Sequence, residues 1–155
     1  MGFEMTTTVL TTDLTTSQTT DGNDTILLTE GASVIVSGGT TAFDIDGVAN
    51  TIFIDGLAVS EARPVYLDFA GTYNSVTIGH TGRVIGLRSS EYALFDQGNN
   101  NVVINHGNIS GLYGVGLDGD GGILNNTGLI EGTYGAGSNV GGVVTRAANV
   151  TILNS

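Results

Sequence analysis

Four aspartates occur at equivalent points of this sequence, each beside an apolar residue near the end of a short alternating segment: Asp46, Asp68, Asp96 and Asp118. If these segments stack in register, the carboxylates form a column with neighbours about 4.8 Å apart. Two such charges repel by about 1 kcal/mol in water. Because Ca²⁺ prefers oxygen ligands, an ion between coils would remove that repulsion, so the four aspartates are candidate calcium ligands. The alternative is that they are corner residues making Asx-turns in water.

Asp21 and Asp24 form a second candidate calcium site, within the stretch Asp21-Gly-Asn-Asp-Thr-Ile26. This stretch resembles one half of the nonapeptide repeat of RTX proteins, which binds Ca²⁺ in tandem arrays. Here the half-motif stands alone, and one copy cannot make the stacked cage. A turn that leads into the first strand is therefore the favoured interpretation.

His80 and His106 occupy matching places in consecutive repeats, so we expect their rings about 5 Å apart on one face. Two stacked imidazoles could bind a transition metal. The sequence adds no convincing third ligand nearby. A corner stack without metal is therefore the favoured interpretation.

Paired carboxylates for polysaccharide hydrolysis could come from Asp44 with Asp68 or Asp118, since such a pair needs a separation of about 5–10 Å. A lyase usually needs a Lys or Arg base, and the chain has no lysine and four scattered arginines. A Ser/His/Asp pattern, a P-loop and a correctly placed GxGxxG are also missing from the sequence. We therefore expect a protein that is not an enzyme, with a polysaccharide-active lyase, epimerase or hydrolase as the alternative.

Self-similar segments would position these residues, and they are the main signal in the sequence. Asp24-Thr-Ile-Leu-Leu28 resembles Asn50-Thr-Ile-Phe-Ile54 and Asn74-Ser-Val-Thr-Ile78. The last apolar residues of such segments are spaced by 26, 24, 26, 20 and 28 residues: Leu28, Ile54, Ile78, Ile104, Leu124 and Ile152. Two further alternating segments follow each of them, divided by Gly, Asn or Asp turns. Each repeat of about 25 residues thus carries three short strands.

This pattern predicts an all-β fold, a parallel β-helix (β-solenoid) with three short strands per coil and about five coils. Each strand would pair with its equivalent in the next coil, with Val, Ile, Leu and Phe inside and Thr, Asp and Asn outside. A β-sandwich or jelly roll gives no reason for strands to recur in threes, and a propeller blade needs four strands. Asparagines before the first strand are expected to stack in a ladder: Asn50, Asn74, Asn100 or Asn101, and Asn149.

The composition limits the partners. The net charge is −11, with 15 acidic residues and 4 basic ones, so binding to nucleic acid or to anionic lipid is disfavoured. Cysteine is absent, which excludes a disulfide scaffold. No segment is long and apolar enough to insert in a membrane, and the N-terminal residues do not read as a cleavable signal.

Two segments are expected. Residues 1–20 are rich in threonine and are interpreted as a leader or an N-terminal cap. Residues 21–155 are interpreted as the solenoid, which ends in mid-coil after Val150-Thr-Ile-Leu-Asn-Ser155. We expect the solenoid to continue beyond that point in a longer protein, or its open end to pair with another copy.

A family resemblance can be stated on two phrases, Ile104-Asn-His-Gly-Asn-Ile-Ser-Gly111 and Ile123-Leu-Asn-Asn-Thr-Gly-Leu-Ile-Glu-Gly132. They resemble the coils of bacterial secreted β-helix proteins, which include autotransporter passengers, large adhesins and RTX-associated repeat proteins. The resemblance covers residues 74–155 well and 24–73 loosely. It implies export and a right-handed parallel β-helix.

The expected function is a non-catalytic structural or adhesive module of an extracellular or cell-surface protein, with calcium as a candidate stabilising ion. The expected partners are neighbouring coils or other copies end to end, and carbohydrate or cell surfaces. A self-assembling filament subunit is a further alternative.

Overall fold

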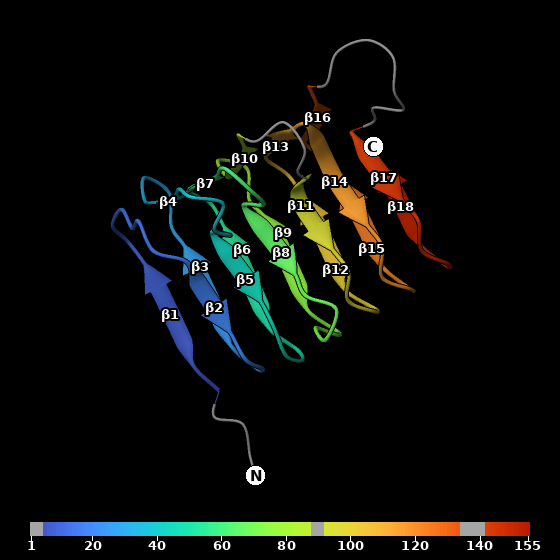
Figure 1. Ribbon diagram of the computed structural model, residues 1–155, viewed down its shortest axis with the longest axis horizontal. Helices are drawn as coiled ribbons and strands as arrows, with labels where there is room; N and C mark the ends of the chain where they lie inside the picture. Colours follow the sequence, from blue (N-terminus) through green and yellow to red (C-terminus); the bar gives the residue numbers. More distant parts are fainter. Residues whose placement is uncertain (1–4, 88–91, 134–141) are drawn as a thin grey trace.

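The computed structural model describes residues 5–87, 92–133 and 142–155, which contain β-strands and turns but no helix, and hence no helix that could cross a membrane. The strands stack along one long axis from the N-terminal to the C-terminal end (Figure 1). They form three parallel sheets, here called A, B and C, which the chain visits in turn in each coil. The fold is a parallel β-solenoid of about five turns, with about 25 residues per turn. The predicted fold class and the three-strand coil are confirmed.

Neighbouring strands of each sheet come from successive coils. Sheet A contains β1 (Thr7–Leu10), β3 (Thr25–Leu28), β6 (Thr51–Ile54), β9 (Ser75–Ile78), β12 (Val102–Asn105), β15 (Ile123–Asn126) and β18 (Thr151–Asn154). Sheet B contains β4 (Ser33–Val36), β7 (Leu57–Ser60), β10 (Arg83–Gly86), β13 (Asn108–Gly111) and β16 (Leu129–Gly132). Sheet C contains β2 (Gln18–Thr20), β5 (Phe43–Ile45), β8 (Val65–Leu67), β11 (Tyr92–Asp96), β14 (Tyr113–Leu117) and β17 (Val143–Thr145).

The interior is a set of stacked aliphatic columns. Leu28 pairs with Ile54, and Ile54 pairs with Ile78 in the next coil. All three side chains are fully buried. Because successive residues of a strand point to opposite faces, the intervening residues of these strands point outward. The alternation in the sequence therefore translates directly into one continuous core.

One coil beyond Ile78, the same column becomes polar. Asn105 pairs with Ile78 on one side and with Asn126 on the other, and both asparagines are buried. The Asn105 amide nitrogen donates to Asn126 Oδ1 at 2.7 Å, and the Asn126 amide nitrogen donates to Asn154 Oδ1 at 2.6 Å. The expectation that asparagines point outward is wrong for these residues, because the in-register stack satisfies their amides inside the solenoid.

A second asparagine stack lies at the corner between sheets C and A. The backbone N–H of Asp24 donates to Asn50 Oδ1 at 2.9 Å. The N–H of Asn50 donates to Asn74 Oδ1, and the N–H of Asn74 donates to Asn101 Oδ1, both at 2.8 Å. The predicted ladder is confirmed for Asn50, Asn74 and Asn101.

Just before this ladder, each coil places one residue in the left-handed backbone region. The residue is Asn or Gly in four coils, with φ between 56° and 72°: Asn23, Asn100, Gly121 and Asn149. Asn149 therefore belongs to this turn position and not to the ladder. In the two remaining coils the position holds Ala49 (φ 61°) and Tyr73 (φ 57°). Side chains of these two types favour that conformation less than Asn or Gly does.

The threonine-rich segment forms part of the solenoid. Strand β1 pairs in parallel with β3, and strand β2 pairs in parallel with β5. Residues 5–20 thus extend sheets A and C by one strand each. Residues 1–4 of this segment lie outside the described residues.

Candidate functional site

The predicted aspartate column lies along the corner where sheet C ends, with one member replaced. The strand register pairs Leu67 of β8 with Asp96 of β11, so the residue level with Asp68 is Gln97. The alignment expected for Asp96 is wrong, because β11 reaches the corner one residue later than the sequence pattern suggested. In chain order the column, here called the corner column, is Asp21, Asp46, Asp68, Gln97, Asp118 and Arg146.

Asp96 points into the solenoid instead. It is 1% exposed, and its Oδ1 accepts hydrogen bonds from the Asn101 amide nitrogen at 2.7 Å and from the Gly98 N–H at 3.0 Å. Burial raises the pKa of this carboxyl to about 6, against the lowering effect of the two hydrogen bonds. Asp96 thereby places an acidic group beside Asn101, which belongs to the asparagine ladder.

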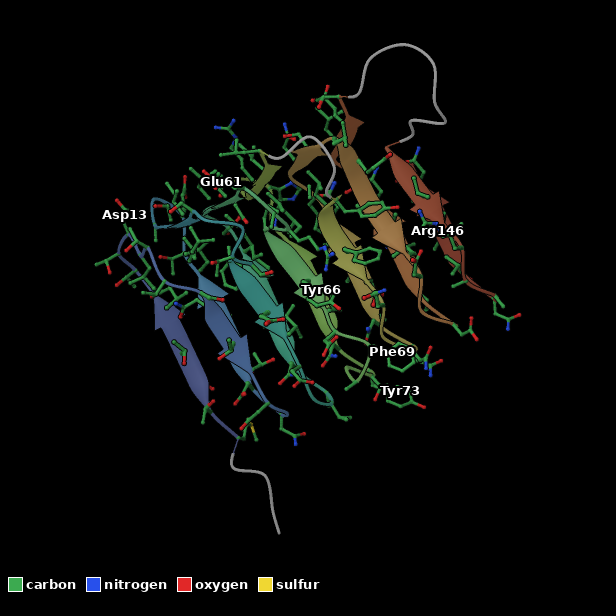
Figure 2. The ribbon with its side chains drawn as sticks, in the orientation of Figure 1. Asp13, Glu61, Tyr66, Phe69, Tyr73 and Arg146 are labelled. Atoms are coloured by element: carbon green, nitrogen blue, oxygen red, sulfur yellow. The ribbon has the colours of Figure 1, made fainter. Side chains whose placement is uncertain are left out.

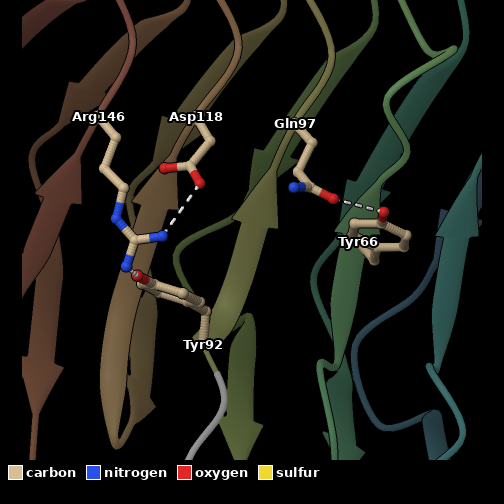
Figure 3. Close-up of polar contacts among 5 residues, drawn as sticks. All are labelled: Tyr66, Tyr92, Gln97, Asp118 and Arg146. Atoms are coloured by element: carbon tan, nitrogen blue, oxygen red, sulfur yellow. Dashed lines mark hydrogen bonds and ion pairs between the residues drawn. The ribbon is translucent and has the colours of Figure 1, made fainter.

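Tyr66 of sheet C contacts two residues in the middle of the corner column through its hydroxyl group. The Tyr66 hydroxyl lies 2.9 Å from Asp68 Oδ1. It also lies 2.7 Å from Gln97 Oε1 (Figure 3). A hydroxyl has one hydrogen and can donate to only one of these oxygens at a time. Burial, followed by the hydrogen bond to Asp68, raises the pKa of Tyr66 to about 12. The hydroxyl is therefore a neutral hydrogen-bonding group at physiological pH.

Aromatic rings from three consecutive coils stack on the outer face of sheet C. The ring centroids of Tyr66 and Phe95 are 6.0 Å apart, those of Phe95 and Tyr92 are 4.7 Å apart, and those of Tyr92 and Tyr113 are 4.9 Å apart. The Arg63 guanidinium lies over two of these rings, 4.9 Å from the Tyr66 centroid and 5.1 Å from the Phe95 centroid. We call these four rings the aromatic stack.

A glycine makes room for this stack. Gly116 occupies an outward position of β14, paired with Phe95 of β11. A Cβ at Gly116 would lie 2.7 Å from a ring carbon of Phe95 and 2.7 Å from one of Tyr92. Any side chain there would displace the rings, so the stack depends on the absence of a side chain at this position.

The stack also contacts the end of the corner column. Arg146 donates to Asp118 Oδ2 and to the Tyr92 hydroxyl, both at 3.4 Å (Figure 3). The Arg146 side chain is 67% exposed, so this ion pair contributes at most about 1 kcal/mol to stability. Most of the Arg146 side chain is therefore open to solvent.

Asp44 adds a carboxyl to the same face, one coil before Tyr66. Burial, together with the negative charges of Asp68 and Asp46, raises the pKa of Asp44, and the nearby Arg63 guanidinium partly offsets the increase. The face therefore combines aromatic rings, three neighbouring carboxyls, an amide and two arginines.

In the second predicted calcium pair, Asp21 and Asp24, the Asp24 carboxylate accepts local hydrogen bonds. The N–H of Asp21 donates to Asp24 Oδ2 at 3.1 Å, and the Thr6 hydroxyl donates to Asp24 Oδ1. The hydrogen bond from Thr6 is the largest influence on the pKa of Asp24 and lowers it. These contacts match the turn that the sequence favoured.

The two histidines stack as predicted. The ring centroids of His80 and His106 are 5.2 Å apart with 30° between the ring planes, and His106 Nδ1 lies 2.6 Å from Thr127 Oγ1. Within residues 5–87, 92–133 and 142–155, no three His, Asp or Glu side chains gather to hold a metal ion.

One exposed feature was missed by the sequence interpretation. The β8–β9 connection has seven residues, 68–74, against five for the β5–β6 connection, 46–50. The extra length is a turn in which the Gly71 N–H donates to the Asp68 carbonyl at 2.8 Å, with Phe69 at its tip. Phe69 is 76% exposed and Tyr73 is 65% exposed, and both project from this loop beyond the strand ends (Figure 2). The connection length was a usable signal, because insertions in a solenoid collect at corners.

Comparisons with known proteins give no further guide to this face. No protein-family model matches the chain, and no curated protein and no solved structure matches it either.

Proposed function

We propose that this chain is a non-catalytic structural and adhesive module of an extracellular or cell-surface protein, similar in kind to the bacterial secreted β-helix proteins. The proposal rests on one observation, the aromatic stack and the corner column that run side by side along sheet C. Both features cross several coils in succession. An extended face of this kind suits contact with a long or repetitive surface.

The interior supports the structural part of this proposal. The ladder through Asn50, Asn74 and Asn101 and the stack through Asn105 and Asn126 link successive coils with side-chain hydrogen bonds. Each coil therefore holds its neighbour through polar contacts as well as through the aliphatic core. A rod built in this way keeps its outer face in fixed register, which preorganises that face for binding.

An adhesion assay tests the proposal. Beads coated with the whole chain are expected to adhere to intact cells under flow, and beads coated with Gly116→Ser are expected to adhere less, because the substitution displaces the aromatic stack. Near-ultraviolet circular dichroism would verify that the rings have moved, and the far-ultraviolet spectrum would verify that the strands remain. Wild-type beads that adhere no better than beads coated with an unrelated acidic protein would contradict the proposal.

A polysaccharide-active enzyme is the second candidate, favoured by the raised pKa of Asp44 beside Asp68. A carboxyl with a raised pKa next to a second carboxyl is the kind of pair that glycoside hydrolysis uses for its acid and its partner. Under this alternative, release of reducing ends from a polysaccharide would be lost in Asp44→Asn and retained in Glu131→Gln. Absence of any release by the wild-type chain would leave the adhesive function alone.

A further inference from the structure

We propose that the β8–β9 corner is a binding site for neutral saccharides, with the rings of Phe69 and Tyr73 as its stacking surface. This assignment deepens the proposed adhesive function and rests on it. It names the class of ligand, a chain of uncharged sugar rings, and the residues that would contact it.

The exposure of the two rings is the first support. Large aromatic side chains gain most from burial, yet Phe69 and Tyr73 are 76% and 65% exposed. Val48, which is 47% exposed, belongs to the neighbouring corner and its backbone bridges to Thr72 of this loop. The corner thus presents apolar surface to solvent next to polar groups, as binding sites do.

The backbone at Tyr73 is the second support. This turn position holds Asn or Gly in four other coils, and a tyrosine there has a φ of 57°. A left-handed conformation of a bulky residue costs about 1 kcal/mol or more. Tyr73 therefore stabilises the turn less than asparagine would, so the stability of the turn does not account for a tyrosine at this position.

Neighbouring polar groups suit sugar hydroxyls. Asp68 Oδ1 accepts from the Phe69 N–H at 2.7 Å and lies 2.9 Å from the Tyr66 hydroxyl. A carboxylate can accept about four hydrogen bonds, so Asp68 retains capacity for hydroxyl donors. The amide of Gln97 is level with it in the corner column. Stacking rings beside planar acceptors match the alternating apolar faces and hydroxyl edges of a saccharide.

The negative charge of this corner and of the whole chain favours uncharged saccharides over anionic ones. The corner is flanked by Asp46 and Asp68, and the whole chain carries a net charge of −11. A uronate or sulfate polymer would be repelled. A neutral polysaccharide pays no such cost, and its binding should be insensitive to salt.

Affinity electrophoresis tests the assignment, because a chain this acidic migrates readily in native gels. Gels would contain a neutral β-glucan, an α-glucan or a galactomannan, with and without added NaCl. We expect at least one polysaccharide to retard the wild-type chain equally in both salt conditions. Phe69→Ser and Tyr73→Asn should each weaken the apparent affinity by about tenfold or more, as expected for an aromatic anchor.

The variants separate binding from folding. Tyr73→Asn places the residue found at Asn23, Asn100 and Asn149 into the same turn, so its melting temperature should equal or exceed that of the wild type. Leu87→Ser, which removes another exposed apolar side chain (63% exposed), should leave retardation unchanged.

Three outcomes would overturn the assignment: no retardation by any of the polysaccharides, equal retardation of wild type and both aromatic variants, or retardation that salt abolishes. Beads that adhere to cells while the gels show no retardation would reject the saccharide and keep the adhesive function. Failure of the beads to adhere anywhere would reject the adhesive function itself.

Discussion

The buried carboxyl of Asp96 links hydrogen bonding at one corner to the pH dependence of folding. Its pKa rises from the ordinary 3.8 to about 6, because burial disfavours the charged form. A carboxyl whose pKa is raised by folding stabilises the folded state while it is protonated. That contribution is complete below about pH 4 and is lost as the pH rises through 6.

Asp96→Asn is therefore expected to stabilise the protein at neutral pH. Asparagine keeps an Oδ1 acceptor for the Asn101 amide and the Gly98 N–H and never ionises. A shift of about two pKa units corresponds to about 3 kcal/mol, so the variant should gain up to about that much in unfolding free energy above pH 7. Near pH 4 the two proteins should be equally stable.

Urea unfolding between pH 4 and 8 measures this difference. Glu131→Gln, which neutralises an exposed carboxyl, should show no such pH-dependent gain over the wild type. A constant difference between Asp96→Asn and the wild type across the pH range would show that the Asp96 carboxyl does not titrate in this window.

At the scale of elements, the asparagine ladder contributes hydrogen bonds between neighbouring coils and hence to the free energy of unfolding. Asn74 is 1% exposed, accepts from the Asn50 N–H at 2.8 Å and donates to the Gly47 carbonyl at 3.3 Å. Asn74→Ala leaves the Asn50 N–H buried without its acceptor. We expect a loss of about 2–3 kcal/mol in unfolding free energy, measured by denaturant titration.

The outward-facing Asn125 of β15 is the matched control. Asn125→Ala should cost less than about 0.5 kcal/mol, as surface substitutions usually do. Equal costs for the two variants would mean that the ladder hydrogen bonds add little beyond amide solvation.

The elements were largely predictable because three alternating segments per repeat admit few packings. Which residues of a segment point inward was not always predictable. Tyr92-Ala-Leu-Phe-Asp96 is apolar at four successive positions, so alternation alone could not show that Asp96 points inward. Asn105 and Asn126 are inside because each donates its amide to the asparagine of the next coil, Asn105 to Asn126 and Asn126 to Asn154, which depends on register between coils. The packing of Tyr92 over Gly116 is likewise a contact between coils that the sequence of either strand does not encode.

For the stability of the whole molecule, the large net negative charge matters more than any one carboxylate. A net charge of −11 on 155 residues repels itself, and Asp44, Asp46 and Asp68 concentrate part of that repulsion on one face. Screening by salt should therefore raise the melting temperature. Ca²⁺ can stabilise such a face in two ways, by binding between specific aspartates or by acting only as a counterion.

The strand register and the existing contacts of the corner column favour a counterion role for Ca²⁺. Gln97 interrupts the corner column, Arg146 pairs with Asp118, and the Asp46 carboxylate already accepts from the Gly47 N–H at 2.7 Å. We predict that CaCl₂ raises the melting temperature no more than NaCl of equal ionic strength, and that a chelator lowers it no further than that difference. A specific site would instead give a shift that grows with the logarithm of Ca²⁺ concentration. If that shift appeared and Asp46→Asn or Asp68→Asn removed it, the calcium column predicted from the sequence would be restored between those two coils.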